Sequence, residues 1–438
     1  MPRRKVAEDP NGRAERFYRE AVSDYRTAGQ LDRDRILYSS AFARLAEVTQ
    51  VVSADKGYVF HNRLTHSLKV AQLARRLAEK LLVDERHIAE AAGGLDPDVA
   101  EAAALAHDLG HPPYGHLAEM ALHDLAATKY RLKDGFEGNA QSFRIVTQLA
   151  VGDGQENYGG GVRPVHGLNL SRATLNAILK YPWLHGKNPR KPSKWGAYRT
   201  ESELFKWTRS KQPFGPCVKS IEAELMDWAD DITFSVHDLV DFYCAGRIPL
   251  DRLVDPHDAI EKQNFFDEVF KRRPELRPRR RQLEEALLGL FGVVTIGGRY
   301  EGTHEQRCQL WHFTTFLITR YVGAISLLDD CAHRAVRIEP SKLDEIRMLK
   351  ELTWHYVILH NELATDQQGQ TQIVKNVFLS LRRAASTESG RKLFPPFFKE
   401  MLRKAKTRQA VTRSVIDYVA SMTERELAKT YRALSGHV

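Results

Sequence analysis

The sequence predicts an all-α fold, one large helical domain with loop insertions, and three observations favour it. Apolar residues recur mainly at helical spacing, strand signals are weak, and the composition is that of a folded globular protein. Of the 438 residues, 42% are hydrophobic and 28% are charged, which is enough apolar material for a sizeable core. The sequence shows no internal repeat, heptad run or low-complexity tract.

Several segments carry the helical pattern, in order along the chain. Apolar positions repeat at helical spacing between Leu64 and Leu81, and residues 98–109 predict a second helix that ends at Gly110 before two prolines. Residues 218–243 predict a third, long helix. Further helices are predicted at residues 282–292, 309–329, 341–362, 370–384 and 411–431.

The segments between these helices give weaker signals. The best strand signal is at residues 293–296, directly before a pair of glycines. Residues 151–167 are rich in glycine, and residues 182–200 are rich in proline, lysine and tryptophan, so both are expected to be irregular loops. Long loops inside a helical domain are often functional.

Charge and cysteine content limit the class of protein. No run approaches the roughly 20 apolar residues of a membrane helix, and no secretory signal is recognised, so we expect a soluble, cytoplasmic protein without a membrane partner. The four cysteines form no Cys-x-x-Cys pair, which fits a reducing compartment. The net charge of +9 favours polyanionic partners, although the basic run at 271–281 is interpreted as a linker or surface turn.

A candidate metal site is the strongest chemical signal. His107 and Asp108 are adjacent near the end of one predicted helix, and His66 lies in the first turn of another. Imidazole and carboxylate groups suit a divalent ion such as Mn, Fe, Zn, Ni or Mg. The structural alternative is a capping aspartate beside a buried histidine.

The residues after this pair point to proton transfer. His116 and Glu119 are three positions apart and share a helix face, so the carboxylate can orient the imidazole as a general acid or base. His111, in the turn between the helices, is a further candidate catalytic residue, with a role in shaping the turn as the alternative.

Aspartates on the predicted helix at 218–243 offer a fourth metal ligand. Either Asp230 or Asp231 would complete a site of two histidines and two aspartates. Water bound by such a site has a lowered pKa and becomes a nucleophile near neutral pH. Arg63, Lys180 and Lys194 are candidate phosphate contacts, with ordinary surface cations as the alternative, and neither a P-loop nor a Gly-x-Ser-x-Gly elbow is present.

Several separate motifs together indicate a family. They are DRILYSSAFARL (34–45) with TQV (49–51), NRLTHS (62–67), HDLGHPPYGHLAE (107–119), FEGNAQS (136–142), KYPW (180–183), ADDITFSVHD (229–238) and DYVASMT (417–423). With these motifs the chain resembles the deoxyguanosinetriphosphate triphosphohydrolase (dGTPase) family of the HD-domain superfamily over residues 30–435. The resemblance implies an HD-domain helical phosphohydrolase fold.

The resemblance also implies an activity and roles for residues. Members hydrolyse dGTP or other dNTPs to a deoxynucleoside and tripolyphosphate, with a divalent metal for which we favour Mn or Mg. The implied metal ligands are His66, His107, Asp108 and Asp230, and His116 would act at the α-phosphate or its leaving oxygen with Glu119 supporting it. The implied substrate contacts are Gln50 and Arg63 for the nucleotide, Lys180, Tyr181 and Lys194 for the phosphates, and Phe234 and Asp238 for the deoxyribose.

The family pattern also sets expectations for organisation and partners. We expect an N-terminal extension at 1–30, an HD catalytic core at 31–260, and a helical C-terminal part at 261–438 that completes the nucleotide site and makes oligomer contacts. Homo-oligomers (tetramers or hexamers) and an activating nucleotide are known in the family. The chain departs from the pattern at Ala43, Phe234, Ser421 and Glu424, which bears on base selectivity.

Two other readings remain open from the sequence. One is another HD-type nucleotide phosphohydrolase. The other is a nucleotide-sensing or single-stranded nucleic-acid-binding module without turnover, in which Trp183, Trp195 and Trp207 would stack on bases. Weak binding of single-stranded nucleic acid is also compatible with catalysis.

Overall fold

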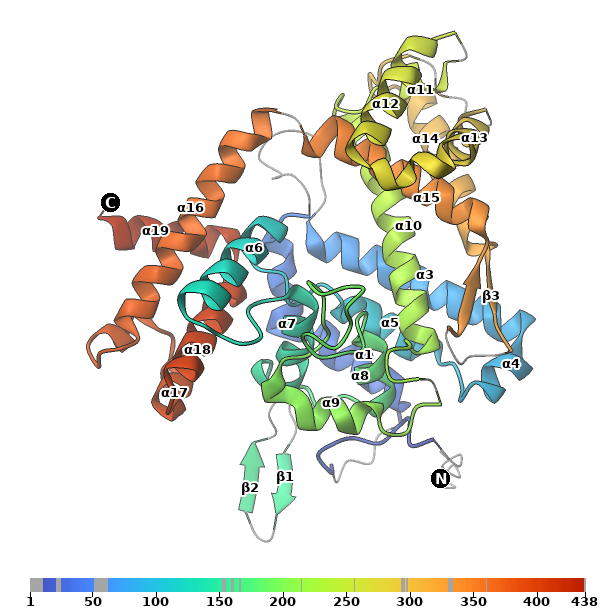
Figure 1. The fold of residues 1–438 in the computed structure, drawn as a ribbon. Helices are drawn as coiled ribbons and strands as arrows, with labels where there is room; N and C mark the ends of the chain where they lie inside the picture. The colour runs from blue at the N-terminus through green and yellow to red at the C-terminus, as the bar shows by residue number, and fades with distance from the viewer. Residues whose placement is uncertain are drawn as a thin grey trace.

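A computed structural model describes residues 11–20, 25–50, 62–151, 155–158, 161–164, 167–213, 215–255, 257–292, 296, 298–329, 334–359 and 361–436. Figure 1 shows helices throughout, with two small antiparallel hairpins, so the predicted all-α class is confirmed. Among the described residues no helix is both long and apolar enough to cross a membrane.

The elements follow one another along the chain, with a long irregular connection between α8 and η5. The helices of the first half are α1 (Ala28–Leu37), α2 (Ser40–Ala43), η1 (Arg44–Glu47), α3 (Arg63–Asp84), α4 (Arg86–Ala91), α5 (Pro97–Ala106), α6 (His116–Asp124), η3 (Leu125–Lys129), α7 (Gly138–Arg144), η4 (Ile145–Leu149), α8 (Arg172–Ile178), η5 (Arg199–Glu201) and α9 (Ser202–Arg209). Those of the second half are α10 (Ile221–Cys244), α11 (Leu250–Val254), α12 (Ala259–Arg272), η6 (Pro274–Arg279), α13 (Arg280–Phe291), α14 (His304–Val322), α15 (Pro340–Thr353), η7 (Trp354–Ile358), α16 (Asn361–Ala384), η8 (Gly390–Leu393), α17 (Pro396–Lys404), α18 (Arg408–Ser421) and α19 (Glu424–Ser435). The strands are β1 (Gln155–Tyr158), β2 (Gly161–Pro164), β3 (Ile325–Leu327) and β4 (Val336–Ile338).

Helix α5 lies at the centre of the HD part because its sequence is small and apolar. It packs against α1, α3, α8 and α10, and its alanines are fully buried. Alanine has high helix propensity and lets neighbouring helices approach closely. The helix begins at Pro97, with the Asp96 carboxylate accepting the Asp98 N–H at 2.8 Å. The functional residues at its end are therefore held by a rigid element.

The C-terminal helices form a second apolar core together with α6. Val377, Phe378 and Leu381 of α16 belong to the same buried cluster as Ala118 and Leu122 of α6. Figure 1 shows α16, α18 and α19 beside α6, away from the α11–α14 group at the other end of the molecule. The helix that begins with His116 is thus packed by residues far along the chain.

The predicted helices at 64–81, 98–109 and 218–243 correspond to α3, α5 and α10. The predicted helix at 309–329 was placed too late, because Thr303 caps α14 and the chain after Val322 pairs as β3 with β4. The predicted segment 341–362 contains α15 from its second residue and the π-helical turn η7, and α16 already begins at Asn361. These boundaries depend on caps and turns more than on apolar spacing.

The predicted helix at 411–431 is wrong in one important respect, because it is broken. α18 ends at Ser421, Met422 has extended backbone angles, and α19 starts at Glu424. Thr423 caps α19 through a capping box with Glu426. The apolar periodicity continues across this break, so spacing alone predicts one helix.

Of the two segments predicted to be irregular loops, one is irregular and the other contains strands. Residues 182–198 are irregular as predicted, apart from an isolated bridge between Leu184 and Ala197. The glycine-rich segment 151–167 instead contains a hairpin, in which Gln155 pairs with Pro164 in β1 and β2. The predicted strand at 293–296 lies outside the described residues except for Ile296, which is in no strand.

Candidate metal centre and active site

A close approach between the turn after α5 and α7 fixes the backbone of the His107–Asp108 pair. The Gly110 N–H donates to the Ser142 hydroxyl at 2.9 Å, and that hydroxyl donates to the His107 carbonyl at 2.9 Å. A side chain at Gly110 would place its Cβ only 2.0 Å from the Gly138 carbonyl oxygen. Only glycine therefore allows the turn after the pair to lie against α7.

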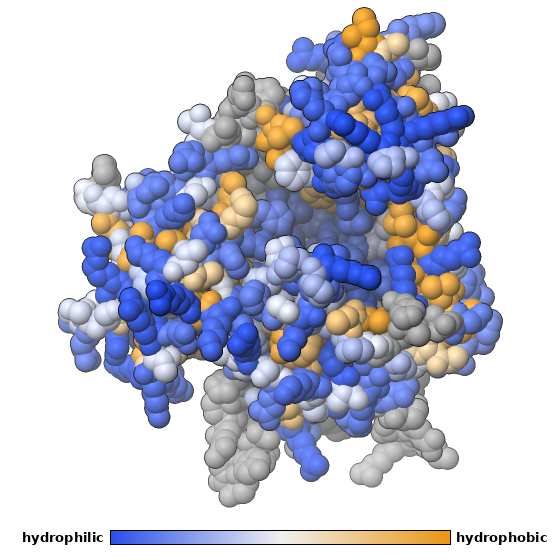
Figure 2. Space-filling view, in the orientation of Figure 1, coloured by the Kyte–Doolittle hydropathy of each residue, from blue (hydrophilic) through white to orange (hydrophobic). Residues whose placement is uncertain are grey.

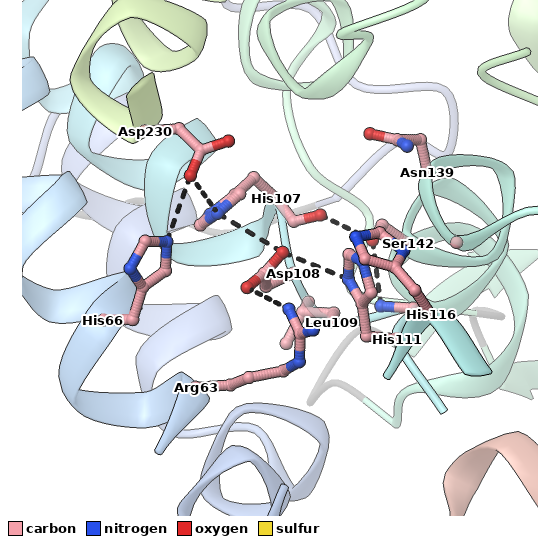
Figure 3. A network of polar contacts seen from close by, with 12 residues as sticks. Arg63, His66, His107, Asp108, Leu109, His111, His116, Asn139, Ser142 and Asp230 are labelled. Atoms are coloured by element: carbon pink, nitrogen blue, oxygen red, sulfur yellow. Dashed lines mark hydrogen bonds and ion pairs between the residues drawn. The ribbon is translucent and has the colours of Figure 1, made fainter. Parts of the chain in front are cut away.

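Two histidines converge on one carboxylate from α10. The His66 Nε2 atom lies 3.1 Å from Asp230 Oδ1, and the His107 Nε2 atom lies 3.7 Å from the same oxygen (Figure 3). The His107 Nδ1 atom faces the Ala104 carbonyl at 2.6 Å, so we assign the proton to Nδ1 and the free lone pair to Nε2. The buried Nε2 atom of His107 has no hydrogen-bond partner among the described residues. Two imidazoles and a carboxylate arranged in this way fit a divalent cation.

Asp108 lies beside this centre, close to two histidines and paired with an arginine. Its Oδ1 atom lies 3.4 Å from His107 Nε2 and 3.1 Å from His111 Nδ1, and its Oδ2 atom accepts from the Arg63 guanidinium at 2.7 Å. Burial acts to raise the pKa of Asp108, but its neighbours His107, Arg63 and His111 hold the pKa well below its usual range. The carboxylate is thus ionised and can serve as a ligand through Oδ1. Arg63, expected at the nucleotide, is buried against Asp108 here.

The structure distinguishes the two candidate aspartates of α10. Asp230 faces the histidines, and its second oxygen accepts from Lys180 Nζ at 2.7 Å. Asp231 faces α15 and accepts from Lys350 Nζ at 2.5 Å. Burial acts to raise the pKa of Asp230, but Lys180 and His107 hold that pKa well below its usual value. Lys180 also lies 2.9 Å from Asp227, so it is clamped between two carboxylates.

A second polar group lies across the site from Asp230. His116 lies 2.9 Å from Glu119 through Nδ1, and its side chain is 73% exposed, which leaves Nε2 accessible. Glu119 also accepts from the Gly138 N–H at 3.2 Å and from Lys194 at 3.3 Å. Figure 3 shows His116 beside His111, with their ring centroids 5.3 Å apart. The pair therefore has the geometry of an oriented, accessible imidazole.

Two pKa shifts describe the groups around His116. Burial, reinforced by Arg63, lowers the pKa of His111 to about 4, so this ring is neutral near pH 7. Burial and the nearby Glu119 raise the pKa of Glu137 to about 6, although Lys194 lies 3.0 Å from Glu137 and opposes this shift. His111 thus keeps its ring neutral beside Asp108.

The residues expected at the sugar and base lie nearby on α10 and after η1. Asp238 is buried, its Oδ2 atom lacks a hydrogen-bond partner among the described residues, and burial raises its pKa to about 8. The buried Oε1 atom of Gln50 likewise has no hydrogen-bond partner in the part of the chain that the structure describes. Phe234 lies one turn before Asp238 and is half-buried. Buried polar atoms without partners are uncommon, and both are suited to receive a ligand.

The basic and aromatic residues of the irregular loop are placed unevenly. Lys191 lies over the half-buried Tyr181 ring, 5.2 Å from its centroid. Trp183 and Trp195 are buried, and the Arg172 guanidinium covers Trp207 at 3.9 Å from the ring centroid. Trp183 and Trp195 are thus inside the protein and the half-buried Trp207 is covered by Arg172, which weakens the support they gave to base stacking. Figure 2 shows a hollow at the centre of one face with mainly hydrophilic residues inside it.

Sequence reasoning missed several residues that build the site. Glu137 and Lys350 pair with predicted site residues, and Arg44 contacts the turn after the His107–Asp108 pair. Glu137 and Arg44 lie inside the quoted motifs, so their positions in those motifs were the available signal. For Lys350, no signal in the sequence marked it.

Comparison with known proteins gives consistent matches. Residues 63–149 match the HD domain, and residues 336–433 match the phosphohydrolase-associated domain. A deoxyguanosinetriphosphate triphosphohydrolase-like protein of Streptomyces coelicolor is 35% identical over 94% of this chain and 93% of its own length. Proteins with the same name from Corynebacterium efficiens (34% identical, 94% of this chain, 92% of the relative) and Caulobacter vibrioides (31%, 99% and 96%) are similar. HD domains are metal-dependent, in agreement with the clustered histidines and aspartate.

Replacing one or the other of two adjacent aspartates tests the metal centre. We expect Asp230→Asn to weaken Mn²⁺ binding by about 100-fold or more, because it removes the anionic group between His66 and His107. The matched control is Asp231→Asn, on the same helix and also paired with a lysine, which should stay within about twofold of the wild type. Titration followed by electron paramagnetic resonance measures free Mn²⁺; equal losses in both variants would contradict the assignment.

Asp238 provides a test by pH. Because its pKa in the folded protein is raised to about 8, it keeps its proton there while the unfolded chain loses it near the ordinary value of 3.8. Stability should therefore fall as pH rises from about 4 to 8, by up to about 1.4 kcal/mol per pH unit from this group. We expect Asp238→Asn to flatten the plot of unfolding free energy, measured with urea, against pH in this range. Asp84→Asn, at an exposed position, should leave the plot unchanged; identical plots for the two variants would show that Asp238 is ionised.

Proposed function

This chain belongs to the family of deoxyguanosinetriphosphate triphosphohydrolase-like proteins, and from this premise we propose that it hydrolyses dGTP, or dNTPs generally, to a deoxynucleoside and tripolyphosphate. The HD domain makes it a phosphohydrolase of the HD type. The observation that carries the proposal is the convergence of His66, His107 and Asp230 opposite an accessible His116–Glu119 pair. Substrate, products and metal identity are parts of this proposal.

The metal ligands proposed are His66, His107, Asp108 and Asp230, with Mn or Mg as the favoured ion. When bound, the ion supplies a lowered pKa for an attacking water and polarises a phosphoryl oxygen. Arg63 holds Asp108 in place through Oδ2, which leaves Oδ1 directed toward the histidines. Lys180 holds Asp230 in the same way from the other side.

His116 is the proposed acid that protonates the leaving 5′ oxygen. Expulsion of an unprotonated alkoxide is unfavourable, so a positioned proton donor lowers the barrier. Glu119 accepts a hydrogen bond from Nδ1, stabilises the protonated ring and leaves Nε2 to donate the proton. His111 is neutral in the folded protein and is proposed to assist by holding Asp108.

The triphosphate would be bound by cations that are now paired with carboxylates. Lys180 lies at the metal side of the site and Lys194 at the His116 side, so the two can contact opposite ends of a phosphate chain. Their ammonium groups would compensate the charge that develops on phosphoryl oxygens. Tyr181 follows Lys180 directly and is proposed as a neutral hydrogen-bond donor to the same chain.

The deoxyribose is proposed to lie between Phe234 and Asp238. A neutral carboxyl at Asp238 can both donate and accept a hydrogen bond with a sugar hydroxyl. The Phe234 ring offers an apolar surface and no partner for a 2′-hydroxyl, which favours deoxynucleotides. Gln50, whose side-chain oxygen has no partner among the described residues, is proposed to contact the nucleoside. By analogy with the family we further propose a cytoplasmic homo-oligomer, a tetramer or hexamer, open to an activating nucleotide.

A product assay tests the function. Purified protein with Mn²⁺ is incubated with each dNTP, with mixtures of dNTPs and with GTP, and the products are resolved by ion-exchange chromatography. We expect deoxynucleoside and tripolyphosphate from one or more dNTPs and neither product from GTP. Release of pyrophosphate or orthophosphate would indicate another HD-type phosphohydrolase, and turnover only in dNTP mixtures would indicate an activating nucleotide.

Replacing His116 separates proton transfer from metal binding. We expect His116→Ala to lower kcat by about 10²- to 10⁴-fold, as for loss of a general acid, while Mn²⁺ affinity stays unchanged because the ring is not among the proposed ligands. Asp108→Ala, in contrast, should lose both. Steady-state kinetics and Mn²⁺ titration measure the two quantities; an unchanged kcat for His116→Ala would remove His116 from the mechanism.

A further inference from the structure

The turn that joins α5 to α6 is held by an arginine from outside the HD motif. Arg44 donates to the carbonyls of Leu109 at 2.9 Å and His111 at 2.8 Å through one nitrogen, and to the carbonyl of Met422 at 3.1 Å through another. Burial lowers the pKa of Arg44 to about 10, so the guanidinium remains charged at neutral pH. One side chain thus ties the residues after Asp108 to the end of α18.

A glutamate from the same C-terminal junction holds the next part of the turn. Glu424 accepts the Thr49 N–H and hydroxyl, both at 2.8 Å, and the Tyr114 N–H at 3.2 Å. Tyr114 has a positive φ of 65°, an unfavourable conformation for a residue with a bulky side chain. A conformation of this kind persists only where neighbouring groups enforce it. Glu424 therefore helps to fix the backbone that enters α6 two residues before His116.

These contacts depend on the break between α18 and α19. In a continuous helix the Met422 carbonyl would accept the N–H four residues later, whereas here the extended residue leaves this carbonyl available to Arg44. Glu424 is the first residue of α19, next to the capping residue Thr423. The break thus presents an acceptor and a carboxylate toward the turn, and both lie in the phosphohydrolase-associated domain.

We propose that the Met422–Glu424 junction is a positioning element of the metal centre, acting through Arg44 on His111 and Asp108 and through Tyr114 on His116. The C-terminal domain then does more than stabilise the fold by apolar packing on α6. Arg44 contacts the side of the turn that orients the Asp108 carboxylate, whereas Glu424 contacts the side that leads to His116. The two residues should therefore have different effects, one on metal affinity and one on turnover.

Arg44 is tested in the full-length protein with a readout that needs no substrate. We expect Arg44→Ala to weaken Mn²⁺ binding by about tenfold, the lower end of the losses seen for residues that orient ligands. Arg44→Lys should recover part of the lost affinity, because an ammonium group can still reach a carbonyl. The matched control is Arg382→Ala, which removes another buried arginine, one that joins α16 to α18 through Thr412.

Thermal unfolding separates positioning from general destabilisation. Arg44→Ala and Arg382→Ala are both expected to lower the midpoint, but only Arg44→Ala should lose Mn²⁺ affinity. If both variants lose stability and both bind Mn²⁺ like the wild type, or if both lose affinity equally, the proposal for Arg44 is overturned.

Glu424 is tested by turnover. We expect Glu424→Ala to lower kcat about tenfold with KM and Mn²⁺ affinity unchanged, since a displaced general acid loses part of its contribution. The kcat of Glu424→Gln should lie between those of the wild type and Glu424→Ala. A Glu424→Ala protein with wild-type kcat would overturn this part. The turnover measurement rests on the proposed function, whereas the Mn²⁺ measurement does not. If the wild-type protein binds Mn²⁺ but hydrolyses no dNTP, the proposed function is wrong, and the Mn²⁺ affinity of Arg44→Ala still tests the role of Arg44.

Discussion

The carboxylate of Asp230 is the group on which the arrangement of the site depends. His66 of α3 and His107 at the end of α5 both lie close to one of its oxygens, and Lys180 donates a hydrogen bond to the other. Removing charges from water is costly unless they are paired. The helices α3, α5 and α10 must therefore meet with these side chains in register, and the small alanine surface of α5 allows them to do so.

Compensation of buried charge continues outward from that carboxylate. Arg63 pairs with Asp108, Lys194 with Glu119 and Glu137, and Lys350 with Asp231. The cations proposed to bind phosphate are thus already held in place by acids. A pre-positioned ammonium group loses less conformational freedom on binding a ligand than a mobile surface lysine does. The same ion pairs would serve the stability of the folded protein and the binding of a polyanion.

Much of the site could be predicted because its signals are local. Adjacent His107 and Asp108, the His116–Glu119 spacing and the helical periodicity of α3, α5 and α10 are all visible in the sequence, and the family membership is confirmed. Spacing alone left Asp230 and Asp231 open, because adjacent residues on a helix point about 100° apart and packing decides which one faces the histidines. The choice of Asp230 came from the family resemblance. The break at Met422 and the contacts of Arg44 and Glu424 depend on partners far along the chain, so spacing could not reveal them.

The most direct measurement is anomalous diffraction at the manganese edge from crystals grown with Mn²⁺. The described residues offer three groups for an ion: His66, His107 and Asp230; His111, His116 and Glu119; and Asp227, Asp230 and Asp231. The account predicts one strong peak within bonding distance of His66, His107, Asp108 and Asp230, with His116 and Glu119 outside the coordination sphere. A peak on His111, His116 and Glu119, with none at the first group, would contradict both the metal centre and the role given to His116.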